Sequence, residues 1–168
     1  DTLDLLVGLA ERFGERLRVR ISGLVSYFLI PDFDERIAAH ANIEFTGRYD
    51  WPVGLGEVYR AVDIVWAQEL AWRGGNSDWL IPNRIYEASY FGVPSLAVRG
   101  TQTAQTIDER ALGYVLTDAG VDTAAAFFET LSQETLASDR ARLLERPDAD
   151  FVLGDDDTTA LLAAVRAQ

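Results

Sequence analysis

Apolar residues recur along the chain with two spacings, one typical of helices and one typical of strands. Positions 3, 6, 9, 10 and 13 are apolar, which predicts an amphipathic helix over 3–13 that ends near Gly14. Arginine and apolar residues alternate over 18–21, and Ser22-Gly23 follows, so this segment predicts a strand and a tight turn. The apolar, β-branched run over 63–67 predicts a strand that is buried on both faces.

The alternation of short helices and strands continues to the end of the chain. Further helices are predicted over 33–41, 55–62, 82–91, 105–110, 123–131, 134–145 and 158–167, and further strands over 43–47, 95–98 and 113–116. The segment 146–150 is expected to be a loop. Strands that alternate with helices over short connections predict the α/β class, as a Rossmann-like three-layer αβα sandwich with a parallel sheet.

The segment 76–97 contains the most informative pattern in the chain. A polar loop leads to Pro82, which suits the first position of a helix because its missing N–H costs no hydrogen bond there. The free N–H groups at a helix start favour a phosphate. Glu87, one turn further, can accept hydrogen bonds from the vicinal hydroxyls of a ribose. The pattern therefore predicts a nucleotide site followed by a buried strand.

The expected position of this site is one edge of the sheet. In parallel α/β sheets, ligands bind at the carboxyl ends of the strands, near the point where the strand order reverses. The loops after Ser22, Gly47, Ala67 and Val98 all follow predicted strands. We therefore expect the ligand contacts to come from these loops.

Length and composition are those of one globular domain, predicted over 1–168 with a C-terminal loop and helix over 147–168. The chain has 168 residues, of which 48% are hydrophobic and 25% charged. It contains no cysteine, which excludes disulfides, cysteine-ligated metals and thiol catalysis. It also contains no methionine, so we expect a processed product or part of a longer protein. No segment is apolar for long enough to span a membrane.

The charge limits the classes of partner. A net charge of −12 argues against a general nucleic-acid or anionic-membrane surface, because both need a basic footprint. A nucleotide remains possible, since Arg48, Arg73, Arg84 and Arg99 lie in the half of the chain that holds the 76–97 pattern. All 15 basic residues are arginine, so a phosphate-binding loop that needs lysine is impossible.

Other sequence motifs for catalysis or metal binding are absent from the sequence or have a simpler structural explanation. No Gly-x-Ser-x-Gly occurs, and the single histidine, His40, excludes a histidine cluster and is expected to be surface structure near a helix end. Asp155-Asp-Asp157 could bind a hard metal ion, but it is better explained as the cap region of the last helix. No metal site is therefore predicted.

Several segments, taken in order, resemble the C-terminal, donor-binding domain of GT-B glycosyltransferases of the group 1 type (family four). They are 43–47, 58–65, 80–87 with Gly92-Val-Pro94, and 113–118 with Asp122 and the helix after it. The resemblance covers roughly residues 1–135 and implies the C-terminal half of a GT-B fold. By this resemblance, we expect the first strand of that domain to be missing here and the chain to begin just after it.

The resemblance implies a role for individual residues. Glu87 matches the second glutamate of the family's paired-glutamate motif and would hold the ribose hydroxyls, whereas Trp79 stands in place of the first glutamate. Backbone at the helix start would lie near the diphosphate, the loop after strand 43–47 would contact the base, and Arg84 stands where relatives often have lysine. The implied donor-binding residues are Glu87, Arg84, Asn83, Pro82, Ile81, Leu80, Trp79, Gly47, Arg48 and Tyr49.

The implied chemistry is transfer of a sugar from a nucleotide diphosphate donor to a polysaccharide, glycolipid or similar acceptor. A helix N-terminus and arginines can stabilise the leaving diphosphate without a metal, and the resemblance implies retention at the sugar carbon and no cofactor. The catalytic groups and acceptor site would come mainly from a missing N-terminal domain. We therefore expect this fragment of a bacterial, cytoplasmic protein to bind donor weakly without turnover, with membrane contact, if any, only through the full-length protein.

The candidate residues, the loop before the helix and the function each have an alternative interpretation. Glu87 could pair with Arg84 on an exposed helix face, and the loop 73–76 could be a flexible connection or could grip the donor. Trp51, Trp72 and Trp79 could form a ligand wall or face the missing domain, whereas Trp66 is expected in the core. The alternative functions are a GT-B-like sugar-nucleotide epimerase and a non-catalytic α/β interaction domain with a degenerate donor site.

Overall fold

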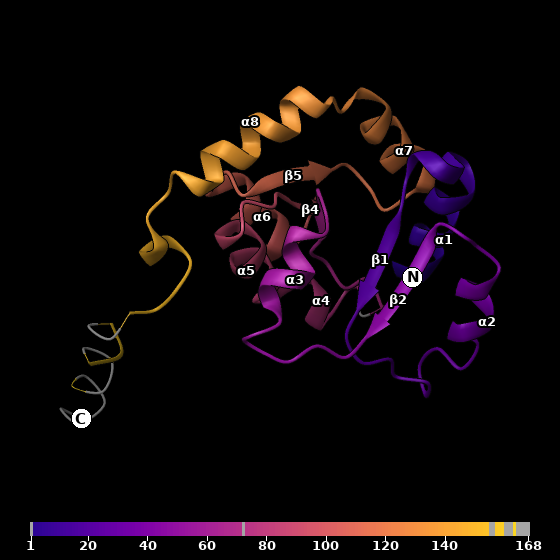
Figure 1. Ribbon diagram of the computed structural model, residues 1–168, viewed down its shortest axis with the longest axis horizontal. Coiled ribbons are helices and arrows are strands. Elements are labelled where there is room, and N and C mark those ends of the chain that lie inside the picture. Colours follow the sequence, from indigo (N-terminus) through magenta and orange to yellow (C-terminus); the bar gives the residue numbers. More distant parts are fainter. Residues whose placement is uncertain (1, 72, 155–156, 160–162, 164–168) are drawn as a thin grey trace.

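The fold is described for residues 2–71, 73–154, 157–159 and 163 of a computed structural model. It contains two parallel sheets (Figure 1). In the first, β1 (Val19–Ser22) pairs with β2 (Ile43–Gly47), and in the second the order is β3 (Val65–Trp66), β4 (Ser95–Val98), β5 (Gly113–Leu116). The α/β class with parallel strands is confirmed, but the described strands form two sheets where a single sheet was predicted.

Helices connect the strands, as the alternating pattern predicts. They are α1 (Thr2–Phe13), α2 (Phe33–Ala38), α3 (Leu55–Arg60), α4 (Asn76–Trp79), α5 (Arg84–Tyr90), α6 (Gln102–Glu109), α7 (Val121–Thr130) and α8 (Gln133–Leu144), with 3₁₀ turns η1 (Gly14–Arg16) and η2 (Asp148–Asp150). The predicted strands over 43–47, 95–98 and 113–116 have the bounds of β2, β4 and β5. Helices α2 and α3 are shorter than predicted.

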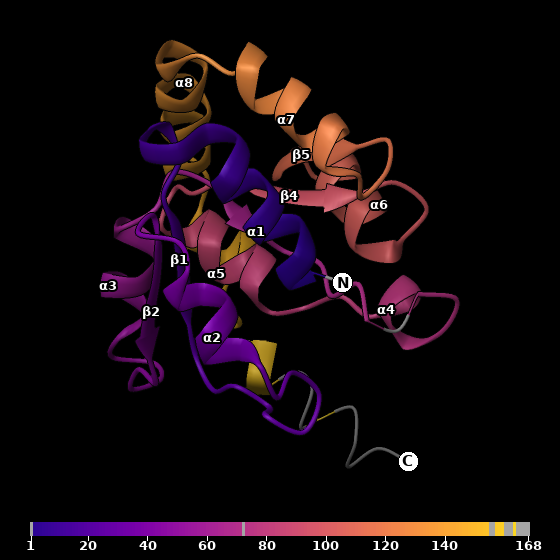
Figure 2. The same ribbon diagram turned by 90° about the vertical axis from the view of Figure 1, so that its right-hand side faces the viewer.

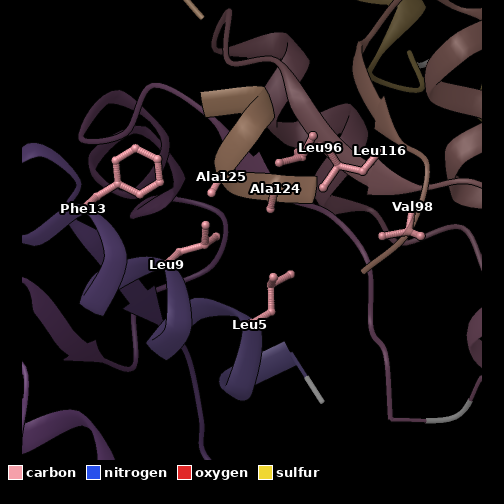
Figure 3. Close-up of a cluster of buried hydrophobic side chains, with 8 residues drawn as sticks. All are labelled: Leu5, Leu9, Phe13, Leu96, Val98, Leu116, Ala124 and Ala125. Atoms are coloured by element: carbon pink, nitrogen blue, oxygen red, sulfur yellow. The ribbon is translucent and has the colours of Figure 1, made fainter. Parts of the chain in front are cut away.

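One side of the second sheet packs against α1 and α7. Leu96 and Val98 alternate along β4 and contact this layer, as the two-residue period of a strand requires. Figure 3 shows these side chains with Leu5 and Leu9 of α1 and their neighbours from α7. Helices α1 and α7 lie beside each other (Figure 2).

The other side of the second sheet packs against α5, α6 and α8. Ala97 of β4 points to this layer and is fully buried, together with Ile85, Ile107 and Leu143 from the three helices. Helices therefore cover both sides of the sheet, and every residue of β4 is buried. This confirms the predicted layers for the part of the sheet that contains β3, β4 and β5.

Asn42 links the first helix to the first sheet. Its side-chain amide donates to the backbone carbonyl oxygens of Ala10, Gly14 and Leu17 at 2.9, 2.9 and 3.0 Å. Carbonyl groups at the end of a helix have no partner within the helix. The Asn42 amide supplies a donor to each of them, the Gly14 carbonyl also accepting from the Leu17 N–H at 3.2 Å, and it holds the end of α1 beside the start of β2.

The segments around β3 and before α5 differ most from the prediction. The strand predicted over 63–67 as buried on both faces is reduced to β3, whose two residues are half-buried, because no described strand pairs with one of its edges. Trp66 nevertheless packs against the core, as predicted. The helix predicted to begin at Pro82 begins at Arg84, and a short helix, α4, replaces part of the polar loop. The final helix and the Asp155-Asp-Asp157 cap lie largely outside the described residues.

We predict that Asn42→Ala lowers the free energy of unfolding by about 1–3 kcal/mol, because it leaves partly buried carbonyl groups without a donor. Urea denaturation measures the change. Asn76→Ala, at an exposed position, is the matched control and should change stability by less than about 0.5 kcal/mol. Equal effects of the two substitutions would contradict the role given to Asn42.

We also predict that Gly113→Ala destabilises the sheet. A Cβ atom at Gly113 would lie 1.9 Å from the carbonyl oxygen of Ser95, its partner across β4 and β5. The strands must separate to admit it, at a cost of about 1–3 kcal/mol or more. Thermal unfolding should show a clear loss for Gly113→Ala and little change for Gly154→Ala, where a Cβ has only a 3.7 Å contact.

Candidate functional site

The Glu87 carboxylate is the point where three separate segments meet. It lies in the first turn of α5, and its Oε2 accepts a hydrogen bond from the Tyr59 hydroxyl on α3 at 2.7 Å. Its Oε1 accepts a hydrogen bond from the indole N–H of Trp51, in the loop after β2, at 3.2 Å. The carboxylate is half-buried and is fixed from two sides.

Tyr59 is the rigid partner of this carboxylate. Its side chain is buried, and its ring stacks on Phe91 with centroids 5.8 Å apart and planes at 15°. Burial raises the pKa of the Tyr59 hydroxyl above its usual value, and the hydrogen bond to the Glu87 carboxylate raises it further. Tyr59 therefore stays protonated and always offers a hydrogen to Glu87.

Trp51 is the exposed partner. Its side chain is 69% exposed, although its N–H is bound to Glu87. An exposed hydrogen bond of this kind contributes little to stability, since water can replace it. A ligand with hydroxyl donors can therefore displace Trp51 from Glu87 more easily than it can displace Tyr59.

Glu87 lies on the wall of a groove of about 2050 Å³. The groove extends along β1 and β3 and under α1. At the end that contains Glu87 it is lined by Tyr49, Trp51, Tyr59, Pro82, Asn83 and Arg84. Tyr49 and Trp51 follow the carboxyl end of β2, Tyr59 lies on α3, and Pro82, Asn83 and Arg84 form the segment between α4 and the start of α5.

Five of the predicted donor-binding residues line this groove. They are Glu87, Arg84, Asn83, Pro82 and Tyr49. Arg84 is exposed at the first position of α5, and its positive charge acts on the Tyr59 hydroxyl. No ion pair joins Arg84 to Glu87 in the described part of the chain, because the carboxylate is taken by Tyr59 and Trp51. The alternative that Glu87 only pairs with Arg84 is therefore wrong.

The other five predicted residues do not line the groove. Trp79 is 67% exposed on α4, and the carbonyl oxygen of Leu80 accepts a hydrogen bond from Thr103 of α6 at 2.8 Å. Ile81 is exposed as well. Gly47 has a φ of +72°, and its carbonyl oxygen accepts a hydrogen bond from the Gly23 N–H. Gly47 therefore lies where the ends of β1 and β2 meet. Arg48 beside it is exposed.

The helix start is also less suited to a phosphate than the sequence suggests. Helix α5 has only seven residues, and the Asn83 side chain makes no cap hydrogen bond. Pro82 lies outside the helix. The N–H groups of Ile85, Tyr86 and Glu87 already donate to the carbonyl groups of Pro82 and Asn83, so any anion here must depend more on Arg84.

The loop before α4 is held closed by Asp78. The Asp78 carboxylate accepts from the Gly74 N–H at 2.7 Å and lies 3.0 Å from the Arg73 guanidinium. Arg73 is therefore engaged within its own loop. Trp72, the neighbouring candidate for a ligand wall, lies outside the described residues. His40 is half-buried and faces Glu11 of α1 at 3.8 Å, which gives it a structural contact.

Sequence patterns did not identify Tyr59 as part of the site, although it lies in the 58–65 segment of the resemblance. It occupies an apolar position of a short helix, and its partner is distant in the chain. Only the pairing of α3 with α5 brings the two side chains together. Trp51 was a candidate for a ligand wall, but its hydrogen bond to Glu87 has no sequence signature.

The chain is similar to proteins that are longer than itself. It is 30% identical to the succinoglycan biosynthesis protein ExoL of Rhizobium meliloti (strain 1021) over 161 residues. The matched region is 96% of this chain and 40% of ExoL. No protein-family model matches the chain. No helix of the described residues is both long and apolar enough to cross a membrane.

Solved structures show the same fold. The crystal structure of Anabaena Alr3699/HepE in complex with UDP and glucose superposes on 98% of this chain and 44% of its own, with a TM-score of 0.71 and 12% identity. The crystal structure of HepE in complex with UDP superposes on 98% of this chain and 45% of its own, with a TM-score of 0.62 and 15% identity. The chain therefore has the Rossmann-like α/β fold found in these structures, and it spans less than half the length of the proteins it resembles.

We predict that Tyr59→Phe lowers the free energy of unfolding by about 1–2 kcal/mol. The ring stack on Phe91 is kept, but a half-buried carboxylate loses its shortest hydrogen bond. Tyr90→Phe is the matched control, because Tyr90 also contacts Phe91 but is 38% exposed. Urea denaturation of both variants measures the difference, and a Tyr59→Phe variant as stable as the Tyr90→Phe variant would disprove this role of the hydroxyl.

Proposed function

We propose that this chain is the nucleotide-diphosphate-sugar-binding part of a glycosyltransferase, the C-terminal domain of a GT-B protein of the group 1 type. The observation on which the proposal depends is the Glu87 carboxylate, held at the carboxyl ends of the strands by Tyr59 and Trp51 and facing a large groove. A fixed acceptor at this position suits the two hydroxyls of a ribose.

Binding of the ribose would change the partners of Glu87. Each vicinal hydroxyl can donate one hydrogen bond to a carboxylate. We propose that the ribose displaces the exposed indole of Trp51 and that Tyr59 remains bound, since its hydroxyl is buried and its hydrogen bond is shorter. Tyr49, half-buried on the groove wall, would then lie beside the base.

The diphosphate would interact with Arg84. Transfer of the sugar leaves a nucleoside diphosphate, so negative charge develops on the phosphate oxygens and is stabilised by a cation or by N–H groups. The Arg84 guanidinium is exposed at the groove and has no ion pair within the described chain. Retention at the sugar carbon and independence of divalent metal are further parts of the proposal, and they rest on the resemblance.

The similar proteins support the choice of ligand and acceptor. HepE is described with UDP and glucose, which favours a uridine diphosphate sugar as donor. ExoL is named for succinoglycan biosynthesis, which favours a growing polysaccharide or a lipid-linked glycan as acceptor. We propose that the acceptor site and most catalytic groups belong to an N-terminal domain, since this chain spans only 40% of ExoL and 44% of HepE.

One observation favours a second candidate, a non-catalytic interaction domain. Trp79 stands where the family motif has its first glutamate, and it is 67% exposed outside the groove. A site with only one carboxylate could keep the fold and lose donor binding. Binding measurements distinguish the two candidates.

We predict saturable binding of UDP or UDP-glucose to the chain by calorimetry, weakened at least tenfold, or about 1.4 kcal/mol, in Glu87→Ala. Quenching or a shift of Trp51 fluorescence should accompany binding. Glu57→Ala, which removes an exposed carboxylate from α3, is the matched control and should bind as the unaltered chain does.

Two outcomes would change the proposal. Absence of binding to UDP-, GDP- and ADP-sugars would favour the interaction domain. Robust sugar transfer by the isolated chain would show that its catalytic groups are not on another domain. A stabilisation of the chain by ligand, measured as a rise in Tm, is expected only at concentrations well above the Kd.

A further inference from the structure

A second hollow lies at the C-terminal end of α5. It has a volume of about 320 Å³ and is formed by the last residues of α3, α5 and α8 and by the segment that follows α8. Figure 1 shows α8 and that segment on the opposite side of the molecule from α1 and α2. No residue lines both this hollow and the groove that contains Glu87. The hollow is therefore a separate feature of the surface.

The hollow is cationic, although the protein is acidic. Arg60, Arg140 and Arg146 line it together with one carboxylate, Asp148, whereas the whole chain has a net charge of −12. The Arg146 guanidinium is already paired with the Asp150 carboxylate at 2.7 Å. Arg60 and Arg140 make no ion pair and no hydrogen bond through their side chains with the described residues. Two guanidinium groups are therefore available to an anion.

Packing holds both arginines beside the turn that ends α5. The Arg60 guanidinium lies over the Phe91 ring, 5.2 Å from its centroid. A Cβ atom at Gly92 would lie 3.1 Å from the Cγ atom of Arg140, so the stem of Arg140 lies directly against this glycine. Arg140 is half-buried, and removing a charge from water is costly unless the charge is paired. The two arginines thus flank one turn, and a counter-charge between them would be favourable.

The number of free guanidinium groups favours a phosphate over a single carboxylate. A phosphate monoester carries a charge of about −1.5 to −2 at neutral pH and has three acceptor oxygens. Guanidinium groups bind such oxygens with paired, parallel hydrogen bonds. A phosphate can therefore bind Arg60 and Arg140 together, whereas one carboxylate would leave one of them without a full partner.

The other walls of the hollow suit a sugar. Tyr90 and Leu144 are 38% and 54% exposed and offer apolar surface beside Phe91. The exposed Asp148 carboxylate accepts no hydrogen bond from a described residue. It would repel a bare phosphate, but it can accept hydrogen bonds from hydroxyl groups. A sugar ring has hydroxyl groups for Asp148 and C–H groups for the apolar wall.

We propose that the hollow between α3, α5 and α8 binds a small sugar phosphate. The phosphate pairs with Arg60 and Arg140, the sugar ring packs against Tyr90, and a sugar hydroxyl donates to Asp148. A volume of about 320 Å³ is at the lower end of the range for ligand pockets, about 300–1000 Å³, which suits a single small molecule. This site is independent of the nucleotide-sugar site proposed at Glu87.

NMR titration of the chain with glucose 1-phosphate and with glucose 6-phosphate tests the proposal. We expect at least one of them to shift the side-chain Nε–H signals of Arg60 and Arg140 saturably, with a Kd of about 1 mM or lower. Inorganic phosphate and glucose, at the same concentration, should each bind at least about tenfold more weakly, because each offers only half of the contacts.

Substitutions locate the bound molecule. Arg140→Gln and Arg60→Gln should each raise the Kd for the sugar phosphate at least about tenfold, because each removes a charged hydrogen-bond donor. Arg142→Gln is the matched control: it removes the same charge from α8, but Arg142 lies outside the hollow and pairs with Asp139 at 3.0 Å. Circular dichroism of each variant checks its folding, and Arg60, which is exposed, provides the test if Arg140→Gln unfolds.

Asp148→Asn separates sugar recognition from anion binding. The substitution removes a charge that repels phosphate and weakens the acceptor for a hydroxyl. The preference for the sugar phosphate over inorganic phosphate should therefore fall about fivefold. An unchanged preference would overturn the proposed contact of the sugar with Asp148.

Three further results would overturn the proposal. The first is that neither sugar phosphate shifts the two arginine signals. The second is that inorganic phosphate binds as tightly as both sugar phosphates, which would make the hollow a general anion site. The third is that binding is lost in Glu87→Ala and kept in Arg140→Gln, which would place the ligand in the other groove. Failure of nucleotide-sugar binding at Glu87 would leave the proposal unaffected.

Discussion

The complete burial of β4 is the constraint on which the rest of the structure depends. Its residues alternate between two helix layers, so α1 and α7 must cover one side while α5, α6 and α8 cover the other. Parallel pairing then requires each connecting helix to return to the same edge of the sheet. That return brings the loops after β2 and β3 to the strand carboxyl ends, where Glu87, Trp51 and Arg84 meet.

The two hydrogen bonds to Glu87 differ in kind, and the difference suits a binding site. Tyr59 is part of a small apolar cluster with Ala88 and Val93, so its hydroxyl direction is set by packing. Trp51 is exposed and can move without disturbing the core. One fixed donor orients the carboxylate, and one replaceable donor keeps its other oxygen satisfied until a ligand binds.

Local sequence patterns predicted where the strands lie better than which elements lie beside them. The bounds of β2 and β5 were correct because β-branched or aromatic residues end at a glycine or begin with one. The polar loop contains α4 instead, because Asp78 binds the Gly74 N–H and closes a turn that composition does not reveal. One parallel sheet was predicted, and the described strands form two. The spacing of apolar residues shows that a strand is buried, but it does not show which strand lies beside it. For the same reason Glu87 could be identified and Tyr59 could not.

Among the described strands, β1 pairs only with β2 and β3 only with β4, and the unpaired edge of each has a consequence for handling the isolated chain. An unpaired strand edge is a template for another copy, and natural proteins protect such edges by covering or charging them. Here the groove beside the edges is lined by apolar and charged side chains alike, and mutual repulsion between molecules with a net charge of −12 also opposes self-association. Salt screens that repulsion at distances beyond about 10 Å at 0.1 M. Low ionic strength and a pH well above the isoelectric point of about 4.4 are therefore the conditions that oppose association of this chain most strongly.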